Sequence, residues 1–139
     1  MIDICAVSRL MAPSERSDRL HELGLLDLRP VDHRWAAERG LRIGPASREL
    51  GARLCESYVA WAGLCRRVPW LERELKSYWR CGADESRVIE PEEAHLLLAS
   101  AKLQRAELDP ALDSDAVAVL DLLIEGLELA ADGGAMWLY

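Results

Sequence analysis

The chain has 139 residues, of which 50% are hydrophobic and 29% are charged, and its formal net charge is 17 − 24 = −7 at pH 7. This composition is too apolar for a disordered chain and the chain is long enough to bury a core, so we expect one domain over residues 1–139. No segment approaches the roughly 18 consecutive apolar residues of a membrane span, and the start, Met1 to Cys5, carries an acid where a secretory signal carries positive charge. We therefore expect a cytoplasmic protein that neither spans a membrane nor is exported.

The cysteines and histidines lack the spacing of a metal site. The chain contains no C-x-x-C pair and no H-x3–5-H pair. A tetrahedral zinc site is therefore poorly supported, and we expect no bound metal or cofactor. In a reducing compartment the four thiols would be free and mostly buried. The residues concerned are Cys5, Cys55, Cys65, Cys81, His21, His33 and His95.

The first part of the chain predicts one short strand followed by helices. Residues 2–7 alternate weakly and are rich in β-branched side chains, which favours a strand. Ser14 can cap a helix that Gly24 stops, and Pro30 can open another that ends at Gly40. Beyond the Gly-Pro break at 44–45, apolar residues from Leu50 to Cys65 recur at spacings of three and four. This periodicity predicts a long amphipathic helix over residues 46–66.

The second part predicts three more helices and a closing strand. Pro69 and Pro91 each suit the first turn of a helix, and the helix after Pro91 has acids near its start and cations near its end. Asp113 or Ser114 caps a last helix through Ala131, after which residues 135–139 resemble a short strand. We expect a mainly α domain of five to six helices. Its alternative is an α+β fold in which the terminal segments pair as strands.

Charge is distributed unevenly along the chain. Residues 1–80 hold 14 Lys and Arg against 11 Asp and Glu, a net charge of +3, whereas residues 81–139 hold 3 against 13, a net charge of −10. This asymmetry indicates either a cationic partner or pairing of the acidic segment with the basic one.

The last predicted helix concentrates that negative charge on one side. At about 100° per residue, four carboxylates fall within a sector of about 60°, and leucines occupy the positions around them. Like charges at i,i+4 destabilise a helix slightly, so a purely structural helix would include lysines here. The four residues form what we call the acidic ridge, and we weigh a docking strip for a basic partner against an ordinary solvated face. The acidic ridge comprises Asp121, Glu125, Glu128 and Asp132.

Residues 58–80 interleave aromatic and basic side chains. Such a mixture occurs at single-stranded nucleic-acid sites and at protein interfaces. The segment also contains glutamates, the whole chain is acidic, and a protein without Phe must use Trp in its core. We therefore expect these aromatics to serve mainly in the core and expect no nucleic-acid partner. They are Tyr58, Trp61, Trp70, Tyr78 and Trp79.

No catalytic motif is present in the sequence. The chain has no phosphate-binding glycine loop, no nucleophile elbow and no H-E-x-x-H. His33 beside Asp32, and His95 three residues after Glu92, are unspecific because general acid–base work needs a further convergent group. We expect ordinary structural or surface histidines and a non-catalytic protein.

A compact acidic domain that has no catalytic motif and carries a one-sided acidic ridge resembles the immunity proteins that bacteria make against their own polymorphic or contact-delivered toxins. The resemblance is one of architecture. It implies an inhibitor that covers the active site of a basic toxin domain, often a nuclease. We hypothesise that the acidic ridge is the centre of contact and that an exposed aromatic such as Trp79 or Trp137 anchors its edge.

Two other functions compete with this one. A small helical enzyme or ligand-binding regulator would hold its pocket between helices and use His95, Glu92 and Cys55. A homo-oligomer would join the basic first part of one chain to the acidic last part of another.

Overall fold

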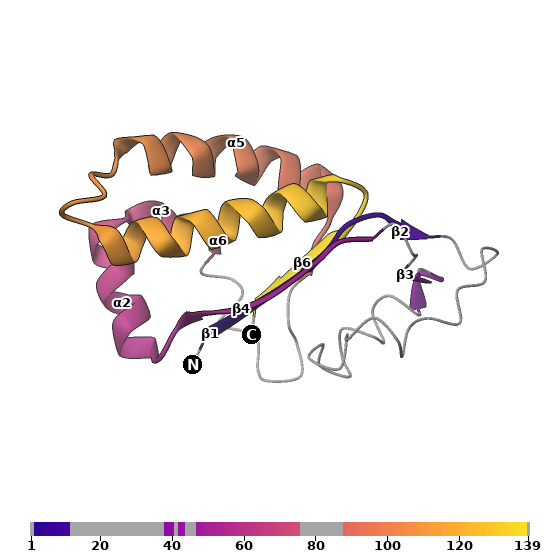
Figure 1. The fold of residues 1–139 in the computed structure, drawn as a ribbon, viewed down its shortest axis with the longest axis horizontal. Helices are drawn as coiled ribbons and strands as arrows, with labels where there is room; N and C mark the ends of the chain where they lie inside the picture. The colour runs from indigo at the N-terminus through magenta and orange to yellow at the C-terminus, as the bar shows by residue number, and fades with distance from the viewer. Residues whose placement is uncertain (1, 12–37, 41, 44–46, 76–87, 139) are drawn as a thin grey trace.

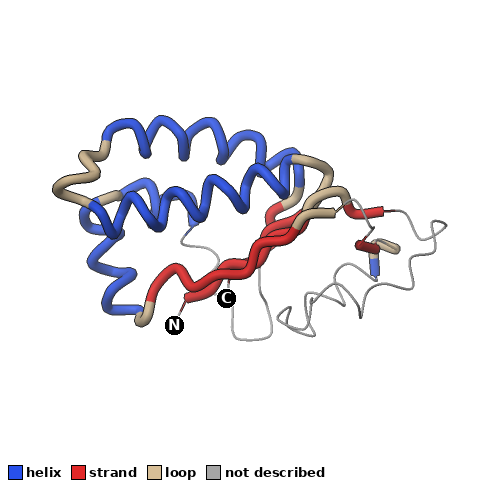
Figure 2. Tube along the Cα trace, viewed as in Figure 1, coloured by secondary structure: helices blue, strands red, loops and turns tan. Residues whose placement is uncertain are grey.

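The structure is a computed structural model, and it describes residues 2–11, 38–40, 42–43, 47–75 and 88–138. Within these residues an antiparallel four-stranded sheet carries helices on one face (Figures 1 and 2). The strand order in the sheet is β4-β1-β6-β5, so the two ends of the chain form the two central strands. The elements are β1 (Ile2–Val7), β2 (Leu10–Met11), β3 (Arg42–Ile43), β4 (Glu49–Cys55), α2 (Tyr58–Arg67), α3 (Pro69–Leu75), β5 (Val88–Ile89), α5 (Pro91–Glu107), α6 (Ser114–Ala131) and β6 (Ala135–Leu138).

The fold class is α+β, which is the alternative that the sequence allowed, and the expectation of a mainly α domain is wrong. The part of the chain that the structure describes contains four helices beside the sheet. Both terminal strands are confirmed, and they pair antiparallel with Ile4 opposite Leu138 and Val7 opposite Ala135. The helices expected after Pro69, after Pro91 and from Ser114 are also confirmed. Those expected between Ser14 and Gly24 and after Pro30 lie essentially outside the described residues.

The helix predicted over residues 46–66 is wrong in its first half, where the chain forms β4. Leu50 and Leu54 are four residues apart, a spacing that suits both a helical face and one side of a strand. Pairing with β1 decides between the two, because it fills the backbone hydrogen bonds of Leu50 and Ala52 from a neighbouring strand. The helix begins only after Ser57, whose hydroxyl accepts a hydrogen bond from the Ala60 N–H at 3.1 Å.

A β-bulge ends β4. Ile2 lies opposite Cys55 and Asp3 lies opposite Arg53, which leaves Leu54 as the extra residue. The bulge explains why Leu54 and Cys55 are both buried although they are consecutive in the strand. It also turns the chain toward α2, the helix at one end of the sheet in Figure 1.

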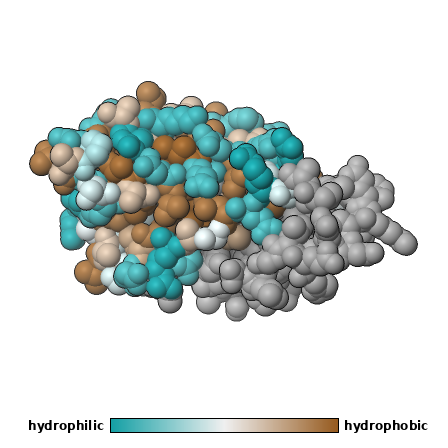
Figure 3. Space-filling view, viewed as in Figure 1, coloured by the Kyte–Doolittle hydropathy of each residue, from teal (hydrophilic) through white to brown (hydrophobic). Residues whose placement is uncertain are grey.

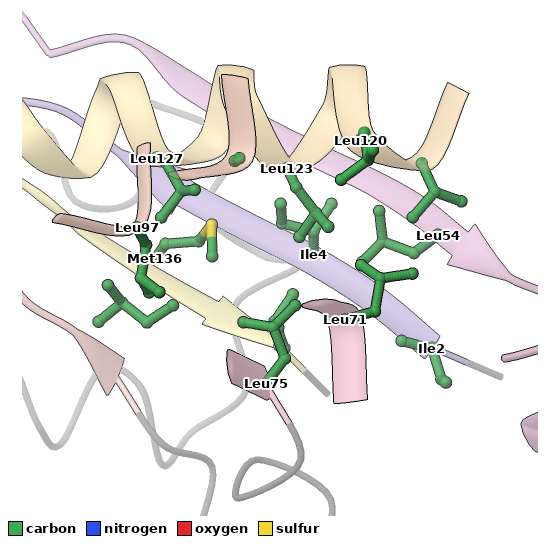
Figure 4. Packing of buried hydrophobic residues seen from close by; sticks show 14 of the residues in the cluster. Ile2, Ile4, Leu54, Leu71, Leu75, Leu97, Leu120, Leu123, Leu127 and Met136 are labelled. Carbon is green, nitrogen blue, oxygen red and sulfur yellow. The ribbon is translucent and has the colours of Figure 1, made fainter. Parts of the chain in front are cut away.

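The core lies between the sheet and the helices (Figure 4). Ile4 and Met136 point up from the central strands toward Leu123 and Leu127 of α6. A Cβ atom on Gly126 would lie 2.7 Å from Ile4 Cδ1 and 2.8 Å from Met136 Sδ, so the missing side chain lets α6 approach the sheet closely. Trp61 and Trp70 are buried in the same core, which confirms the core role expected for these two aromatics, whereas Tyr58 is exposed and that expectation is wrong for it.

None of the helices in the described segments combines the length and the apolar character needed to cross a membrane.

Candidate partner-binding surface

The acidic ridge lies on the side of α6 that faces away from the sheet. Asp121, Glu125 and Glu128 are exposed because Leu120, Leu123 and Leu127 hold the opposite side of the helix in the core. The fourth carboxylate, Asp132, is the C-cap residue of α6, and its side chain is 41% exposed.

Three of the four ridge carboxylates are paired with cations of the same chain. Arg105 Nε lies 2.8 Å from Asp121 Oδ1, and Lys102 Nζ lies 3.4 Å from Glu128 Oε1, so both pairs join α5 to α6. Arg9 Nε lies 2.9 Å from Asp132 Oδ2. Within the described residues no cation pairs with Glu125. Among the described residues, three of the four ridge charges are therefore balanced, and Glu125 is the ridge carboxylate without a paired cation.

Part of the charge asymmetry is resolved by pairing within the chain. Arg67 of α2 contacts both Asp113 and Asp115 at the start of α6, and Arg9 contacts Asp132 at its end. The basic first part and the acidic last part thus meet at both ends of α6. This is the second of the two interpretations that the sequence allowed.

The outer side of α5 carries apolar side chains that the sequence analysis did not single out. Leu96 is 77% exposed and Leu103 is 68% exposed, and Ala99 and Ala106 between and after them are also exposed. Their spacings of three, four and three place all four on one line of the helix. We call these four residues the apolar stripe. Hydrophobic atoms project at the upper edge of the molecule, over α5, in Figure 3.

The signal for the apolar stripe was present in the sequence but ambiguous. Leu96, Leu97 and Leu98 are consecutive, so periodicity alone does not say which of them faces inward. The structure buries Leu97 and exposes Leu96, because the sheet and α6 lie on the side of α5 that carries Ala94, Leu97 and Ala101. Apolar side chains that face solvent in a row can mark an interaction site, whereas buried ones only form the core.

A groove of about 540 Å³ opens between β4, α2 and α6. Leu54, Leu64 and Leu122 contribute apolar surface to it, while Arg53 with Glu56 and Arg67 with Asp115 form ion pairs among its lining residues. The volume is in the range of small-molecule sites. The charged groups of the lining are already paired, so the groove presents mainly apolar surface.

The groove does not bring together His95, Glu92 and Cys55, the three residues that the enzyme alternative would use. Cys55 lines it, but burial raises the pKa of the Cys55 thiol, which opposes formation of a thiolate nucleophile. His95 and Glu92 lie on α5, exposed, and are not among the residues that line the groove. The structure therefore does not place His95 and Glu92 beside Cys55 in this groove.

The aromatic anchors have different outcomes. Trp137 is 1% exposed and lies on the sheet face opposite α6, clustered with Cys5, Val7 and Ala135. The expectation of an exposed Trp137 is wrong, because in β6 alternate side chains point to opposite faces and both faces are buried. Trp79 lies outside the described residues.

The side chains of Cys5, Cys55 and Cys65 are buried, as expected, and Cys55 and Cys65 are free thiols, while Cys81 lies outside the described residues. In the segments that the structure describes, no three His, Cys, Asp or Glu side chains group as metal ligands would.

Comparison with protein-family models, with curated proteins and with solved structures found no match to the chain.

Proposed function

We propose that the chain is a non-catalytic cytoplasmic module that binds and neutralises a basic protein, in the manner of bacterial toxin immunity proteins. The observation that carries the proposal is the exposure of Leu96 and Leu103 on α5, beside the carboxylates of α6. Protein interfaces combine a desolvated apolar centre with a polar rim. Here α5 carries the apolar side chains and the neighbouring helix α6 carries the polar ones.

The pairing of α5 with α6 places the two features side by side. Lys102 and Arg105 reach from α5 to Glu128 and Asp121, so the apolar stripe and the acidic ridge are separated only by this row of ion pairs. A partner that covers Leu103 would also reach Glu125, whose carboxylate has no cation partner among the described residues. We therefore move the proposed centre of contact from the acidic ridge alone to the apolar stripe, with Glu125 as the charged contact.

A basic partner suits this surface for an electrostatic reason. The chain has a net charge of −7, which steers a cationic protein toward it. An active site built for phosphate would accept the Glu125 carboxylate while a neighbouring apolar surface covers Leu96 and Leu103.

The test is neutralisation, with capture as its first step. The wild-type chain is used to capture a protein from a lysate of its source, and that protein is then expressed alone and together with the chain. We expect it to stop growth alone and to be harmless beside the wild type. Leu96→Glu/Leu103→Glu and Glu125→Lys should each lose protection while keeping their helical circular dichroism.

The matched control for the charge change is Glu72→Lys on α3, an exposed glutamate outside the α5–α6 layer, which should protect like the wild type. A captured protein that is harmless when expressed alone would overturn the proposal. Equal protection by the wild type and by the α5 and Glu125 variants would overturn the assigned surface.

A ligand-binding regulator is the second candidate, and the groove between β4, α2 and α6 is the observation that favours it. The site would then be lined by Leu54, Leu64 and Leu122 rather than lie near His95. Ala118 also lines the groove. Saturable binding of a small apolar molecule that Ala118→Trp abolishes, without any neutralised protein, would favour this candidate.

A further inference from the structure

The outer edge of β4 carries no further strand in the part of the chain that the structure describes. This strand is last in the order β4-β1-β6-β5, and among the described residues only β1 pairs with it. A Cβ atom added to Gly51, near the middle of β4, would meet no heavy atom of the described segments within 4 Å. A strand of seven residues without proline or lysine is an edge that another chain can extend.

The direction of the free backbone groups follows from the pairing with β1. The Ser8 N–H donates to the Arg48 carbonyl at 2.9 Å, in the same register that places Val7 opposite Glu49 and Cys5 opposite Gly51. In an antiparallel pair, hydrogen-bonded and non-hydrogen-bonded positions alternate. The backbone groups of Leu50 and Ala52 therefore point to β1, whereas those of Glu49, Gly51 and Arg53 point to the open edge.

The side chains along this edge are complementary to themselves. A second β4 strand, antiparallel and centred on Gly51, would place Glu49 of each copy opposite Arg53 of the other. Glu49, Gly51 and Arg53 share one face of the strand, so both charge pairs would form on that face. On the other face Leu50 would lie opposite Ala52 of the second copy, extending the apolar surface under the helices.

Both charged groups are available for such contacts. Within the described residues Glu49 has no ion-pair partner. Arg53 is 47% exposed and shares its guanidinium group between Asp3 and Glu56, each at 3.3 Å. A guanidinium group has five N–H donors, so Arg53 can keep Asp3 and also donate to a carboxylate across the edge.

We propose that two copies of the chain associate through their β4 strands, antiparallel about Gly51, and join their two sheets into one continuous sheet. In this arrangement Gly51 lies opposite Gly51 of the second copy, and Glu49 lies opposite its Arg53. The backbone groups of these residues point away from β1, so each of these pairs would be joined by backbone hydrogen bonds. The bulge at Leu54 limits the shared ladder to residues 49–53. This interface does not use α5, and it stands independently of the proposed function.

The test measures the mass in solution by sedimentation velocity over a concentration series. We expect a dimer for the wild type. Glu49→Arg and Arg53→Glu each set like charges opposite one another and should raise the Kd of the dimer by roughly ten-fold or more. The double variant Glu49→Arg/Arg53→Glu exchanges the charges and should restore the wild-type Kd.

Gly51→Pro tests the backbone ladder separately. It removes an N–H that points to the open edge and takes no donor from the pairing with β1, so it should give a monomer with unchanged circular dichroism. A monomeric wild type at every concentration up to about 0.5 mM would overturn the proposal, as would failure of the double variant to recover. A dimer that resists all of these changes but dissociates with Leu103→Glu would assign the contact to α5 and overturn the β4 interface.

Discussion

Arg67, in the last turn of α2, donates hydrogen bonds from both terminal nitrogens of its guanidinium group to the two carboxylate oxygens of Asp115 in the first turn of α6. The Nη1–Oδ1 distance is 2.9 Å and the Nη2–Oδ2 distance is 2.5 Å. Each residue also sits at the helix end that favours its charge, a cation at a C-terminus and an anion at an N-terminus. The pair therefore connects α2 to α6 across the groove, and it lowers the pKa of Asp115 to about 2.

Loss of this pair should appear as a pH-dependent loss of stability. A carboxyl group whose pKa is lower in the folded than in the unfolded state adds stability above its unfolded pKa, here 3.8, and loses it as the pH falls toward 2. Because Asp115 is 61% exposed, we expect Asp115→Asn to cost no more than about 1 kcal/mol at pH 7. Urea unfolding at several pH values should show this difference shrinking between pH 4 and about 2.

Gly134→Ala should be strongly destabilising. A Cβ atom at this position would overlap the carbonyl oxygen of Val7 and lie 2.8 Å from that of Leu129, and backbone atoms cannot move aside as side-chain ends can. We expect a loss of about 3 kcal/mol or more in the free energy of unfolding, measured in urea. The control is Gly63→Ala in α2, where only Arg66 lies near, at 3.9 Å, and where alanine should stabilise the helix by up to about 1 kcal/mol. Equal effects at the two glycines would contradict this reading of the packing.

Ser100→Ala should leave a buried indole N–H without its acceptor. The Trp70 Nε1–H donates to Ser100 Oγ at 3.0 Å, and the Ser100 hydroxyl donates to the Leu97 carbonyl at 3.1 Å. Since Trp70 is 2% exposed, we expect a cost of about 1 to 3 kcal/mol in thermal or urea unfolding. Ser100→Thr keeps the hydroxyl and should recover part of the loss. A Ser100→Ala protein as stable as the wild type would show that this bond contributes nothing.

Cys55 and Cys65 should resist alkylation in the folded protein. Both side chains are less than 9% exposed, and burial raises the pKa of both thiols, so little thiolate is present at pH 8. A short pulse of iodoacetamide, read at each cysteine by mass spectrometry, should label them slowly in buffer and rapidly in denaturing urea. Rapid labelling of Cys55 in buffer would instead indicate that the groove gives reagents access to its thiol.

Some elements follow from local signals and agree with the structure. Pro91 occupies the first turn of α5, Ser114 begins α6, and the β-branched residues of 2–7 form β1. These signals suffice because caps, proline and periodicity act within a few residues of the backbone they shape. The leucines of α6 likewise predicted which side of that helix is buried.

Local signals were enough to predict the helices and strands of the segments in which those signals agree, and helical periodicity placed the acidic ridge on one side of α6. Tertiary structure alone decided the strand at Leu50 to Leu54, the burial of Trp137 and the neutralisation of Asp121 by Arg105. A four-residue spacing fits both helix and strand until a neighbouring strand supplies hydrogen bonds, and a charge is paired only when another element brings its partner within reach. Those contacts join residues far apart in the chain, so no local pattern contains them.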